Sequence, residues 1–354
     1  MGANTKIEWC DFTFNPWRGC QKVAAGCVNC YAESQSKRNP KTLGVWGPDG
    51  TRVVASESMW RQPLGWNKVQ HCYPQIPKPR VFCASLADVF EDWQGECVCA
   101  DGSAHYTRDG DPTKMVTNRQ MMGFDSDGYR YTTLDDVRAR LFRLIDSTPS
   151  LDWLLLTKRP ENVRRMLPIK TGRRDAIKDG RANIEAWRRE NVWLGTSIAC
   201  QEDADRNVPE LLKCRDLCAK TVLSIEPLIG PVDLDECWPG GMPSPGRGPY
   251  VPGVDWVIVG GESGPNARPC DIAWIRSIVR QCKYAGVPCF VKQLGARVLV
   301  EEYAPHDWPD GVYFSTQSGL DDDMDNDPSV CDLRDPKGGD PAEWPEDVRV
   351  REVP

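Results

Sequence analysis

The chain has 354 residues, of which 40% are hydrophobic and 27% are charged, a composition typical of a folded globular protein. No apolar run approaches the ~18 residues of a membrane-spanning helix, and the N-terminal residues lack the apolar core of a signal peptide. These features predict a cytoplasmic protein with no membrane segment. In that compartment the 16 cysteines are expected to be buried or to bind metal rather than to form disulfides.

The formal net charge of −7 is unevenly distributed along the chain. Residues 301–354 carry 16 acidic and 4 basic side chains, which predicts an acidic C-terminal segment with a flexible surface run at 321–327. Residues 158–190 instead carry 11 basic and 5 acidic side chains. This basic stretch has two interpretations: a solvated loop or helix, and a patch that faces phosphate groups.

The first motif in chain order is GCQKVAAGCVNCYAE at residues 19–33, which contains three cysteines in the spacing C-x6-C-x2-C. A structural zinc site needs four ligands, and the distant Cys10 could supply the fourth. Alternatively, Cys20, Cys27 and Cys30 could hold a [4Fe–4S] cluster and leave one iron open. In radical S-adenosylmethionine (SAM) enzymes that open iron binds SAM, although their usual spacing is C-x3-C-x2-C. The spacing alone leaves both interpretations open.

Apolar runs alternate with amphipathic patterns along the rest of the chain. With a first short strand before the cysteines, about seven strands are predicted, the others at 79–85, 152–158, 191–199, 221–227, 255–264 and 288–295. Helices are predicted at 31–38, 133–147, 161–167, 204–216 and 271–286. Thr133 is the expected N-cap of the second helix, and Gly286 is expected to end the last one.

Strands that are apolar throughout and separated by helices predict a parallel sheet covered by helices, as in a full or partial β/α barrel over residues 5–300. Insertions rich in Gly, Asp or Pro interrupt the pattern at about 92–131 and 233–253. In the first insertion, Cys97, Cys99 and His105 could ligate zinc but lack an evident fourth ligand. The other interpretation of that insertion is an exposed, hairpin-like excursion.

Polar residues follow nearly every predicted strand, at the ends that would surround one cavity in a barrel. They are Ser85, Asp88, Lys158, Arg159, Thr196, Ser197, Glu226, Gly260, Gly261, Glu262, Lys292 and Gln293. None of the three histidines is among them, so a histidine-based hydrolytic triad has little support. No residue is assigned a catalytic role. Trp9, Phe14 and Trp17 near the cysteines are expected to pack around them, with base stacking as the alternative.

Several segments between residues 5 and 295 resemble a phage-encoded radical-SAM-like family with an N-terminal three-cysteine motif. They are IEWCDFTFNPWRGC, GCVNCYAE, LLLTKRPEN, LGTSIA, LSIEPLIG, VIVGGESGPNARP and CFVKQLG. The resemblance implies a partial β/α barrel of the radical SAM type, with a [4Fe–4S] cluster on Cys20, Cys27 and Cys30, and SAM as cofactor. Members of this family are implicated in thymidine hypermodification of phage DNA, where a radical SAM isomerase rearranges a glycine adduct on the thymine methyl group. The implied protein is phage-encoded and acts in the host cytoplasm.

The strand-end residues are candidates for the roles that such a site needs, by their position in the predicted barrel. The cofactor-binding candidates are Ser85, Asp88, Thr196, Ser197, Glu226, Gly260, Gly261 and Glu262, although the family's GGE segment normally follows an earlier strand. Candidates for binding substrate or phosphate are Lys158, Arg159, Lys292 and Gln293. The expected partners are a modified DNA base or nucleotide and a reductant such as flavodoxin or ferredoxin.

Three other functions remain open from the sequence. One is a radical SAM enzyme of another class, for DNA photolesion repair or for tRNA or peptide modification. The second is a zinc-stabilised nucleic-acid-binding protein. The third is a β/α-barrel enzyme whose cysteines are only structural.

Overall fold

The computed structural model describes residues 5–109, 111–117, 128–170, 187–234, 253–300, 307–309, 312–316 and 329–354. Three sequence predictions fall wholly or largely outside these ranges: the middle of the basic stretch 158–190, most of the insertion 233–253, and the acidic run 321–327.

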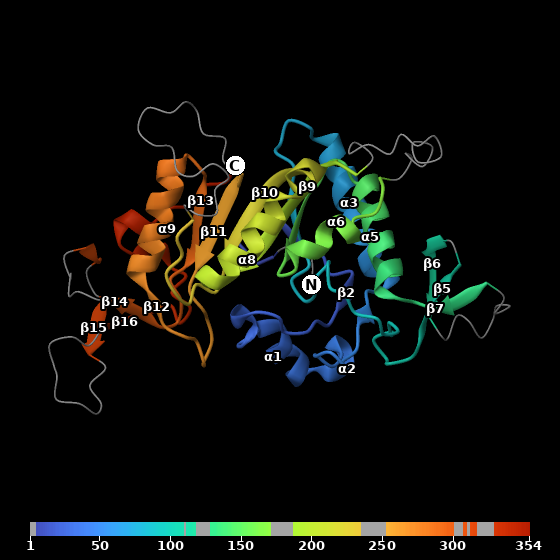
Figure 1. Cartoon of the computed structure of the whole chain (residues 1–354), viewed down its shortest axis with the longest axis horizontal. Coiled ribbons are helices and arrows are strands. Elements are labelled where there is room, and N and C mark those ends of the chain that lie inside the picture. Colours follow the sequence, from blue (N-terminus) through green and yellow to red (C-terminus); the bar gives the residue numbers. More distant parts are fainter. Residues whose placement is uncertain are drawn as a thin grey trace. The chain divides into compact units, whose positions relative to one another are not determined.

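The main sheet has seven strands in the order β1-β4-β8-β9-β10-β11-β13. Figure 1 labels four of them, β9, β10, β11 and β13. The strands are β1 (Phe12–Thr13), β4 (Arg80–Cys83), β8 (Asp152–Thr157), β9 (Arg189–Ile198), β10 (Cys218–Ile225), β11 (Trp256–Gly260) and β13 (Cys289–Gln293). Strand β4 runs parallel to β1 and β8, and β11 runs parallel to β10 and β13. This mixed α/β arrangement confirms the predicted parallel sheet and is compatible with a partial β/α barrel.

Strands β8 and β11 are largely apolar because both faces of the sheet are covered. In β8, every residue after Asp152 is buried, and all five residues of β11 are buried. These continuous apolar runs are the feature that made both strands recognisable in the sequence.

The chain divides into two compact units. Unit 1 comprises Met1–Val23, Cys30–Gly195 and Lys213–Ala219, and unit 2 comprises Ala24–Asn29, Thr196–Leu212 and Lys220–Pro354. The predicted three-cysteine loop therefore belongs to unit 1 at its two ends and to unit 2 in its middle.

Unit 1 contains five α-helices in its described part and two small sheets. The helices are α1 (Tyr31–Arg38), α2 (Pro40–Leu43), α3 (Glu57–Cys72), α5 (Leu134–Ser147) and α6 (Val163–Met166), with the 3₁₀ turns η2 (Pro160–Asn162) and η4 (Arg215–Leu217). The small sheets are β2 (Trp17–Arg18) with β3 (Val53–Val54), and β5 (His105–Arg108) between β6 (Asp111–Thr117) and β7 (Tyr129–Tyr131). Helix α5 begins as predicted, because Thr133 and Asp136 form a reciprocal capping box.

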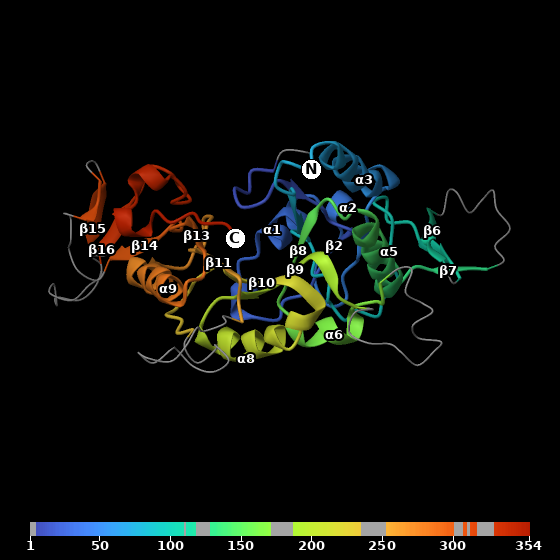
Figure 2. The same cartoon turned by 90° about the horizontal axis from the view of Figure 1, so that it is seen from above.

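The predicted insertion at 92–131 is more than an exposed hairpin. Strands β5, β6 and β7 form a three-stranded antiparallel sheet at the α5 end of unit 1, visible in both views (Figure 1, Figure 2). Cys97 is 0% exposed and His105 is 6% exposed. Parts of the insertion are therefore buried within unit 1.

Unit 2 contains α8 (Gln201–Leu212), α9 (Ile272–Ala285) and a second sheet in the order β12-β14-β16-β15. The strands of that sheet are β12 (Cys270–Asp271), β14 (Val298–Val300), β15 (Tyr313–Thr316) and β16 (Ser329–Asp332), and the 3₁₀ turns of the unit are η1 (Ala25–Cys27), η7 (Pro341–Glu343) and η8 (Glu346–Val348). Helix α9 ends as predicted at Gly286, which adopts a left-handed conformation with φ of 67°.

Two predicted helices differ from the observed ones at their ends. The helix expected at 161–167 is a 3₁₀ turn, η2, followed by the short α6, because Pro160 starts a tight turn directly after β8. Helix α8 begins at Gln201, three residues before the predicted start. No helix in the described residues combines the length and apolar character needed to span a membrane.

Candidate functional site

The three aromatic residues that flank the cysteine motif are buried in unit 1. Trp9 and Trp17 are 2% and 0% exposed, and Phe14 lies with its ring centroid 5.2 Å from that of Trp60. Side chains enclosed to this degree cannot stack on a nucleobase. The alternative of base stacking is therefore wrong, while their packing around the cysteines themselves stays a prediction.

In unit 1, the loops after β4 and β8 bring several predicted site residues together. The two strands pair in parallel, with Cys83 opposite Leu155, so the residues that follow them meet at one sheet edge. Asp88 is buried and accepts hydrogen bonds at both carboxylate oxygens. Its donors are the Thr157 hydroxyl (2.7 Å) and the backbone N–H groups of Phe90 (3.0 Å) and Lys158 (3.0 Å), together with Arg159 Nη1 (2.8 Å).

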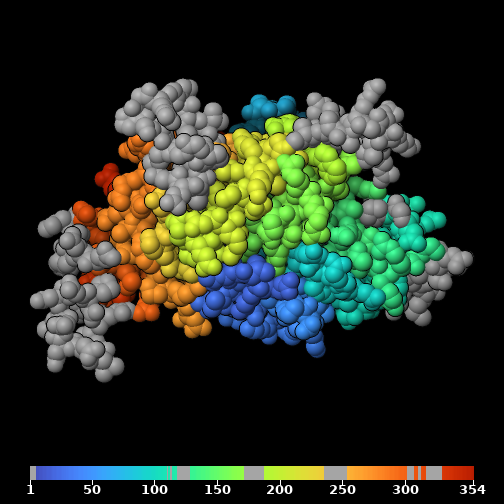
Figure 3. All heavy atoms as spheres, viewed as in Figure 1, coloured from blue at the N-terminus to red at the C-terminus, as the bar shows by residue number. Residues whose placement is uncertain are grey.

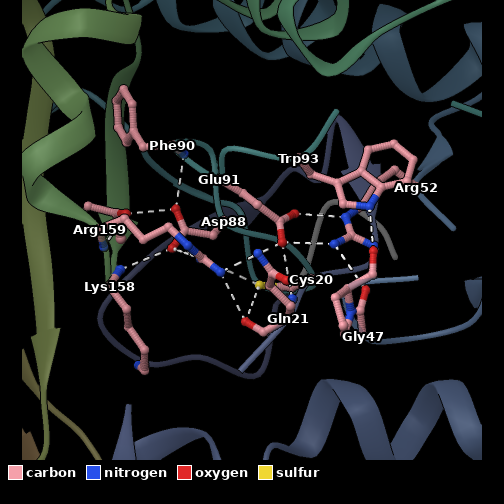
Figure 4. Close-up of polar contacts among 12 residues, drawn as sticks. Cys20, Gln21, Gly47, Arg52, Asp88, Phe90, Glu91, Trp93, Lys158 and Arg159 are labelled. Carbon is pink, nitrogen blue, oxygen red and sulfur yellow. Dashed lines mark hydrogen bonds and ion pairs between the residues drawn. The ribbon is translucent and has the colours of Figure 1, made fainter. Parts of the chain in front are cut away.

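Arg159 connects this edge to the cysteine motif (Figure 4). Its Nη2 donates to the backbone carbonyl of Gln21 at 3.0 Å, and its Nη1 lies 3.8 Å from Cys20 Sγ. Burial opposes the charge on Arg159, but Asp88, Cys20 and Glu91 outweigh it and raise the pKa of the guanidinium. Arg159 therefore remains a cation directly beside the first cysteine.

A second buried ion pair, between Glu91 and Arg52, contacts the backbone N–H of Gln21, whose carbonyl Arg159 binds. Glu91 and Arg52 are both 0% exposed, and the Glu91 carboxylate accepts from Arg52 Nε at 2.7 Å and from Nη2 at 2.8 Å. Glu91 Oε1 also accepts from the backbone N–H of Gln21 at 3.1 Å. Glu91 and Arg159 thus bind both the N–H and the C=O of the residue after Cys20 (Figure 4).

The Cys20 thiol is protonated in this environment. Burial, followed by the Glu91 and Asp88 carboxylates, raises its pKa to about 12, while Arg159 opposes the rise. Its Sγ donates to the backbone carbonyl of Gln21 at 3.4 Å. Loss of the proton would therefore have to accompany the binding of a metal.

In unit 2, an ion pair holds the middle of the cysteine motif. Arg268 Nη2 lies 2.8 Å from Glu262 Oε1, and Arg268 Nη1 donates to the backbone carbonyl of Ala25 at 2.9 Å. The side-chain amide of Asn29 donates to Glu262 Oε2 at 3.0 Å and to the carbonyl of Asn266 at 2.7 Å. Burial would raise the pKa of Glu262, but the hydrogen bonds from Arg268 and Asn29 overcome it and lower that pKa.

The remaining predicted residues of unit 2 lie at the ends of β9, β10, β11 and β13. Thr196 and Ser197 are buried within β9, and Lys292 Nζ lies 2.8 Å from Glu226 Oε1. A Cβ added to Gly261 would lie 2.1 Å from the Leu294 carbonyl oxygen, so this glycine allows the close approach of two backbone segments. Gln293 donates to the Gly261 carbonyl at 2.8 Å.

The structure therefore groups the predicted site residues into two sets. Unit 1 holds Cys20, Cys30, Ser85, Asp88, Lys158 and Arg159, and unit 2 holds Cys27, Thr196, Ser197, Glu226, Gly260, Gly261, Glu262, Lys292 and Gln293. Their roles in binding cofactor or substrate stay predictions. The structure shows that Arg159 donates a hydrogen bond to the backbone of the cysteine motif and that Asp88 accepts one from Arg159. It also shows that Glu262 accepts hydrogen bonds from Asn29 of the motif and from Arg268.

Sequence reasoning missed several residues of these networks. Arg52 and Glu91 lie in segments with no motif, and their pairing across 39 residues leaves no local signal. Arg268 lies inside the quoted segment VIVGGESGPNARP, where an arginine six residues after a glutamate could have been considered as its partner.

In the part of the chain that the structure describes, no three Cys, His, Asp or Glu side chains are grouped as metal ligands. This statement covers Cys20, Cys27 and Cys30 as well as the alternative zinc set of Cys97, Cys99 and His105. The cysteine motif nevertheless fits an iron–sulfur cluster in its donor chemistry. Cys20, Cys27 and Cys30 are free, partly exposed thiols, and a guanidinium lies beside the first.

The loop around these thiols reaches the protein surface. Val28 is 56% exposed, and Tyr31 at the start of α1 is 54% exposed while its hydroxyl donates to the Ser85 carbonyl at 2.6 Å. Figure 3 shows α1 and α2 in blue on the surface of the face drawn. A group held on the thiols would therefore be reachable from solvent.

One family comparison covers most of the chain. The family DUF5131, described as a protein of unknown function, matches residues 4–98 and 105–317. No curated protein and no solved structure matches the chain.

Proposed function

Because the chain belongs to the DUF5131 family, whose function is unknown, we propose a function from its own residues: it is a radical SAM enzyme. Cys20, Cys27 and Cys30 would hold a [4Fe–4S] cluster, and the iron without a protein ligand would bind SAM. The partial β/α barrel with which the sheet is compatible would then be of the radical SAM type.

One observation carries the proposal: ion pairs bind the backbone beside the cysteines, and those beside Cys20 are buried. Glu91 and Arg159 bind both polar groups of Gln21, and Arg268 binds the carbonyl of Ala25. Buried ion pairs contribute little net stability because of the desolvation that they require, so their use at a partly exposed loop points to a need for fixed geometry. Three thiols that must share one cluster have that need.

When bound, the cluster and SAM would supply a 5′-deoxyadenosyl radical that abstracts a hydrogen atom from the substrate. The chain's own residues would prepare the site for it. The Arg159 cation offsets the negative charge that gathers when Cys20 loses its proton, and Asp88 keeps that cation in place. In unit 2, Glu262 would orient Arg268 and Asn29 by accepting hydrogen bonds from both.

We propose a thymine-derived base carrying a glycine adduct in DNA as the substrate, and an isomerisation of that adduct as the reaction. The support is the resemblance of the quoted segments to the phage hypermodification family, together with the chemistry. Forming a carbon–carbon bond at an unactivated carbon calls for a radical rather than for an acid–base pair. The reductant would be a flavodoxin or a ferredoxin.

The first test is metal analysis and low-temperature EPR on the full-length protein, reconstituted without oxygen and reduced with dithionite. We expect about four irons per chain and a [4Fe–4S]⁺ signal that changes when SAM is added. Cys27→Ala should lose the signal. Cys72→Ala, which removes an exposed cysteine at the end of α3, should keep it.

Two results would overturn the proposal. Zinc without iron in the purified protein would support the zinc-stabilised nucleic-acid-binding protein instead. Equal iron binding by Cys27→Ala and the unmodified chain would mean that the motif does not hold the cluster.

A separate test addresses the substrate. An oligonucleotide with nitrogen-linked glycine on a thymine methyl group should be converted, with SAM and a reduced flavodoxin, to an isomer of equal mass that chromatography resolves. Conversion of a thymine photodimer or of tRNA instead, with the cluster present, would keep the enzyme class and reject this substrate.

A further inference from the structure

Arg18 lies two residues before the first cysteine of the motif, in a backbone segment held on both sides. It belongs to β2, where it pairs with Val53 of β3 in antiparallel register. The neighbouring Gly19 N–H donates to the Leu86 carbonyl at 3.0 Å. These contacts fix the direction in which the Arg18 side chain leaves the backbone, and the residue is only 9% exposed.

The Arg18 guanidinium has no partner among the residues that the structure describes. Its Nε is buried without a hydrogen-bond acceptor. No described carboxylate lies within ion-pair distance of Arg18. An arginine cannot lose its charge to relieve this situation, because its pKa lies far above neutral pH.

The other buried arginines of the described chain are each paired with a carboxylate. Their pairs are Arg52 with Glu91, Arg138 with Asp135, Arg159 with Asp88 and Arg189 with Asp146. Arg52 is the nearest comparison, because it directly precedes Val53, the strand partner of Arg18. Its guanidinium also donates to the carbonyls of Gly47 (3.3 Å) and Thr51 (3.2 Å).

Leaving one buried cation unpaired is costly, since the desolvation of an ion is offset only by a well-placed counter-charge. Such departures from the pairing seen elsewhere in a fold concentrate at functional sites. The planar fork of a guanidinium matches the two oxygens of a carboxylate or of a phosphate group better than any other ligand.

We propose that Arg18 is the anchor of an oxyanion-binding site, which takes the carboxylate or phosphate group of a small-molecule ligand or of the substrate. The site lies in unit 1 and needs no metal. It goes beyond the function proposed above, and it holds or fails independently of whether a cluster binds.

The test is calorimetric binding to the metal-free, full-length protein, with two pairs of probes. SAM is compared with 5′-methylthioadenosine, which lacks the carboxylate, and thymidine 5′-monophosphate is compared with thymidine, which lacks the phosphate. We expect the member of one pair that carries the carboxylate or phosphate group to bind at least about tenfold more tightly, and Arg18→Gln to remove that advantage. An advantage in the SAM pair identifies the ligand group bound by Arg18 as a carboxylate, and an advantage in the thymidine pair identifies it as a phosphate.

The matched control is Arg61→Gln, which removes the same charge from an exposed position on α3 and should leave the advantage unchanged. Melting in anion-free buffer gives a second readout. Because Arg18 is unpaired there, Arg18→Gln should melt at the same temperature as the unmodified chain or higher. Should Arg18→Gln fail to fold, Arg18→Lys decides, since it keeps the charge and should retain part of the advantage.

The proposal is overturned if neither SAM nor thymidine 5′-monophosphate binds more tightly than the counterpart that lacks its carboxylate or phosphate group. It is also overturned if Arg18→Gln lowers the melting temperature in anion-free buffer while the binding advantage persists. That combination would make Arg18 a structural residue.

Discussion

At the scale of single residues, two arginines with the same contact distance differ only in their surroundings. Arg159 and Arg165 each place a guanidinium nitrogen 2.8 Å from a carboxylate oxygen, of Asp88 and Asp92 respectively. The first pair has side chains that are 7% exposed, and the second pair is 60% and 43% exposed. The free energy of unfolding that is lost with an ion pair depends on whether the charged partner that remains is buried or solvated by water.

We therefore expect Arg159→Gln to lower the free energy of unfolding by about 3–5 kcal/mol, because it leaves the buried Asp88 without its counter-charge. Arg165→Gln should cost less than ~1 kcal/mol, since water solvates the partner that remains. Urea unfolding of the metal-free protein measures both. Equal losses would contradict the role given to Arg159.

His105 gives the chain a predicted sensitivity to mild acid. Burial, followed by repulsion from Arg140, lowers its pKa from 6.5 to about 4. The unfolded chain therefore binds the proton more readily than the folded chain between these values, and stability falls as the pH drops through 6.5 toward 4. At pH 5 this single group should cost about 2 kcal/mol relative to pH 7.

Comparison of urea unfolding at pH 7 and pH 5 checks this expectation. His105→Gln should remove most of the difference, whatever its effect at pH 7. His71→Gln, at an exposed position of α3, should leave it. A pH dependence that survives in His105→Gln would assign the effect to other groups.

At the scale of elements, two glycines differ in the space that surrounds them. Gly261 follows β11, and a Cβ there would lie 2.1 Å from the Leu294 carbonyl oxygen. Gly65 lies inside α3, and a Cβ there would meet nothing within 4 Å. The close approach of two backbone segments therefore determines the effect of a side chain at Gly261, whereas helix propensity determines it at Gly65.

We expect Gly261→Ala to destabilise the protein by about 1–3 kcal/mol, since backbone atoms must move to make room. Gly65→Ala should stabilise it by about 0.5–1 kcal/mol, because alanine restricts the unfolded chain and favours the helix. Thermal melting with a van't Hoff analysis can distinguish the two signs. A stabilising Gly261→Ala would mean that the close approach after β11 is not required.

At the scale of the whole chain, the C-terminal residues are part of the core of unit 2. The Val291 N–H in β13 donates to the Val350 carbonyl at 2.8 Å, and the Glu352 N–H donates to the Cys289 carbonyl at 2.8 Å. Trp344 is 0% exposed, and its indole N–H donates to the Gly338 carbonyl at 3.0 Å. The described part of the predicted acidic segment thus covers the open edge of the main sheet beside β13.

Trp344→Ala should lower the free energy of unfolding by about 3–5 kcal/mol, as expected for removal of a fully buried aromatic side chain. Val353→Ala, at a residue that is 42% exposed, should change it by less than ~0.5 kcal/mol. Denaturant unfolding followed by circular dichroism measures both. A negligible loss for Trp344→Ala would show that the tail does not contribute to the core.

The sequence by itself determined the strands of the main sheet, the parallel type of that sheet and several helices, but neither α3 (Glu57–Cys72) nor the strands of the smaller sheets. Continuous apolar runs predicted β8 and β11, and local capping chemistry predicted the start of α5 at Thr133 and the end of α9 at Gly286. These signals survive in the sequence because helix periodicity, strand burial and capping all act between residues that are close along the chain.

Only the tertiary structure decided which charges meet. Arg159 reaches Gln21 across 138 residues, and Arg268 reaches Ala25 across 243. It also decided that Arg52 has a partner while Arg18 has none among the described residues, although Arg18 lies in β2 and Arg52 directly precedes β3, the strand that pairs with it. Pairing and burial over such separations depend on the packing of the whole chain, which no local pattern of residues encodes.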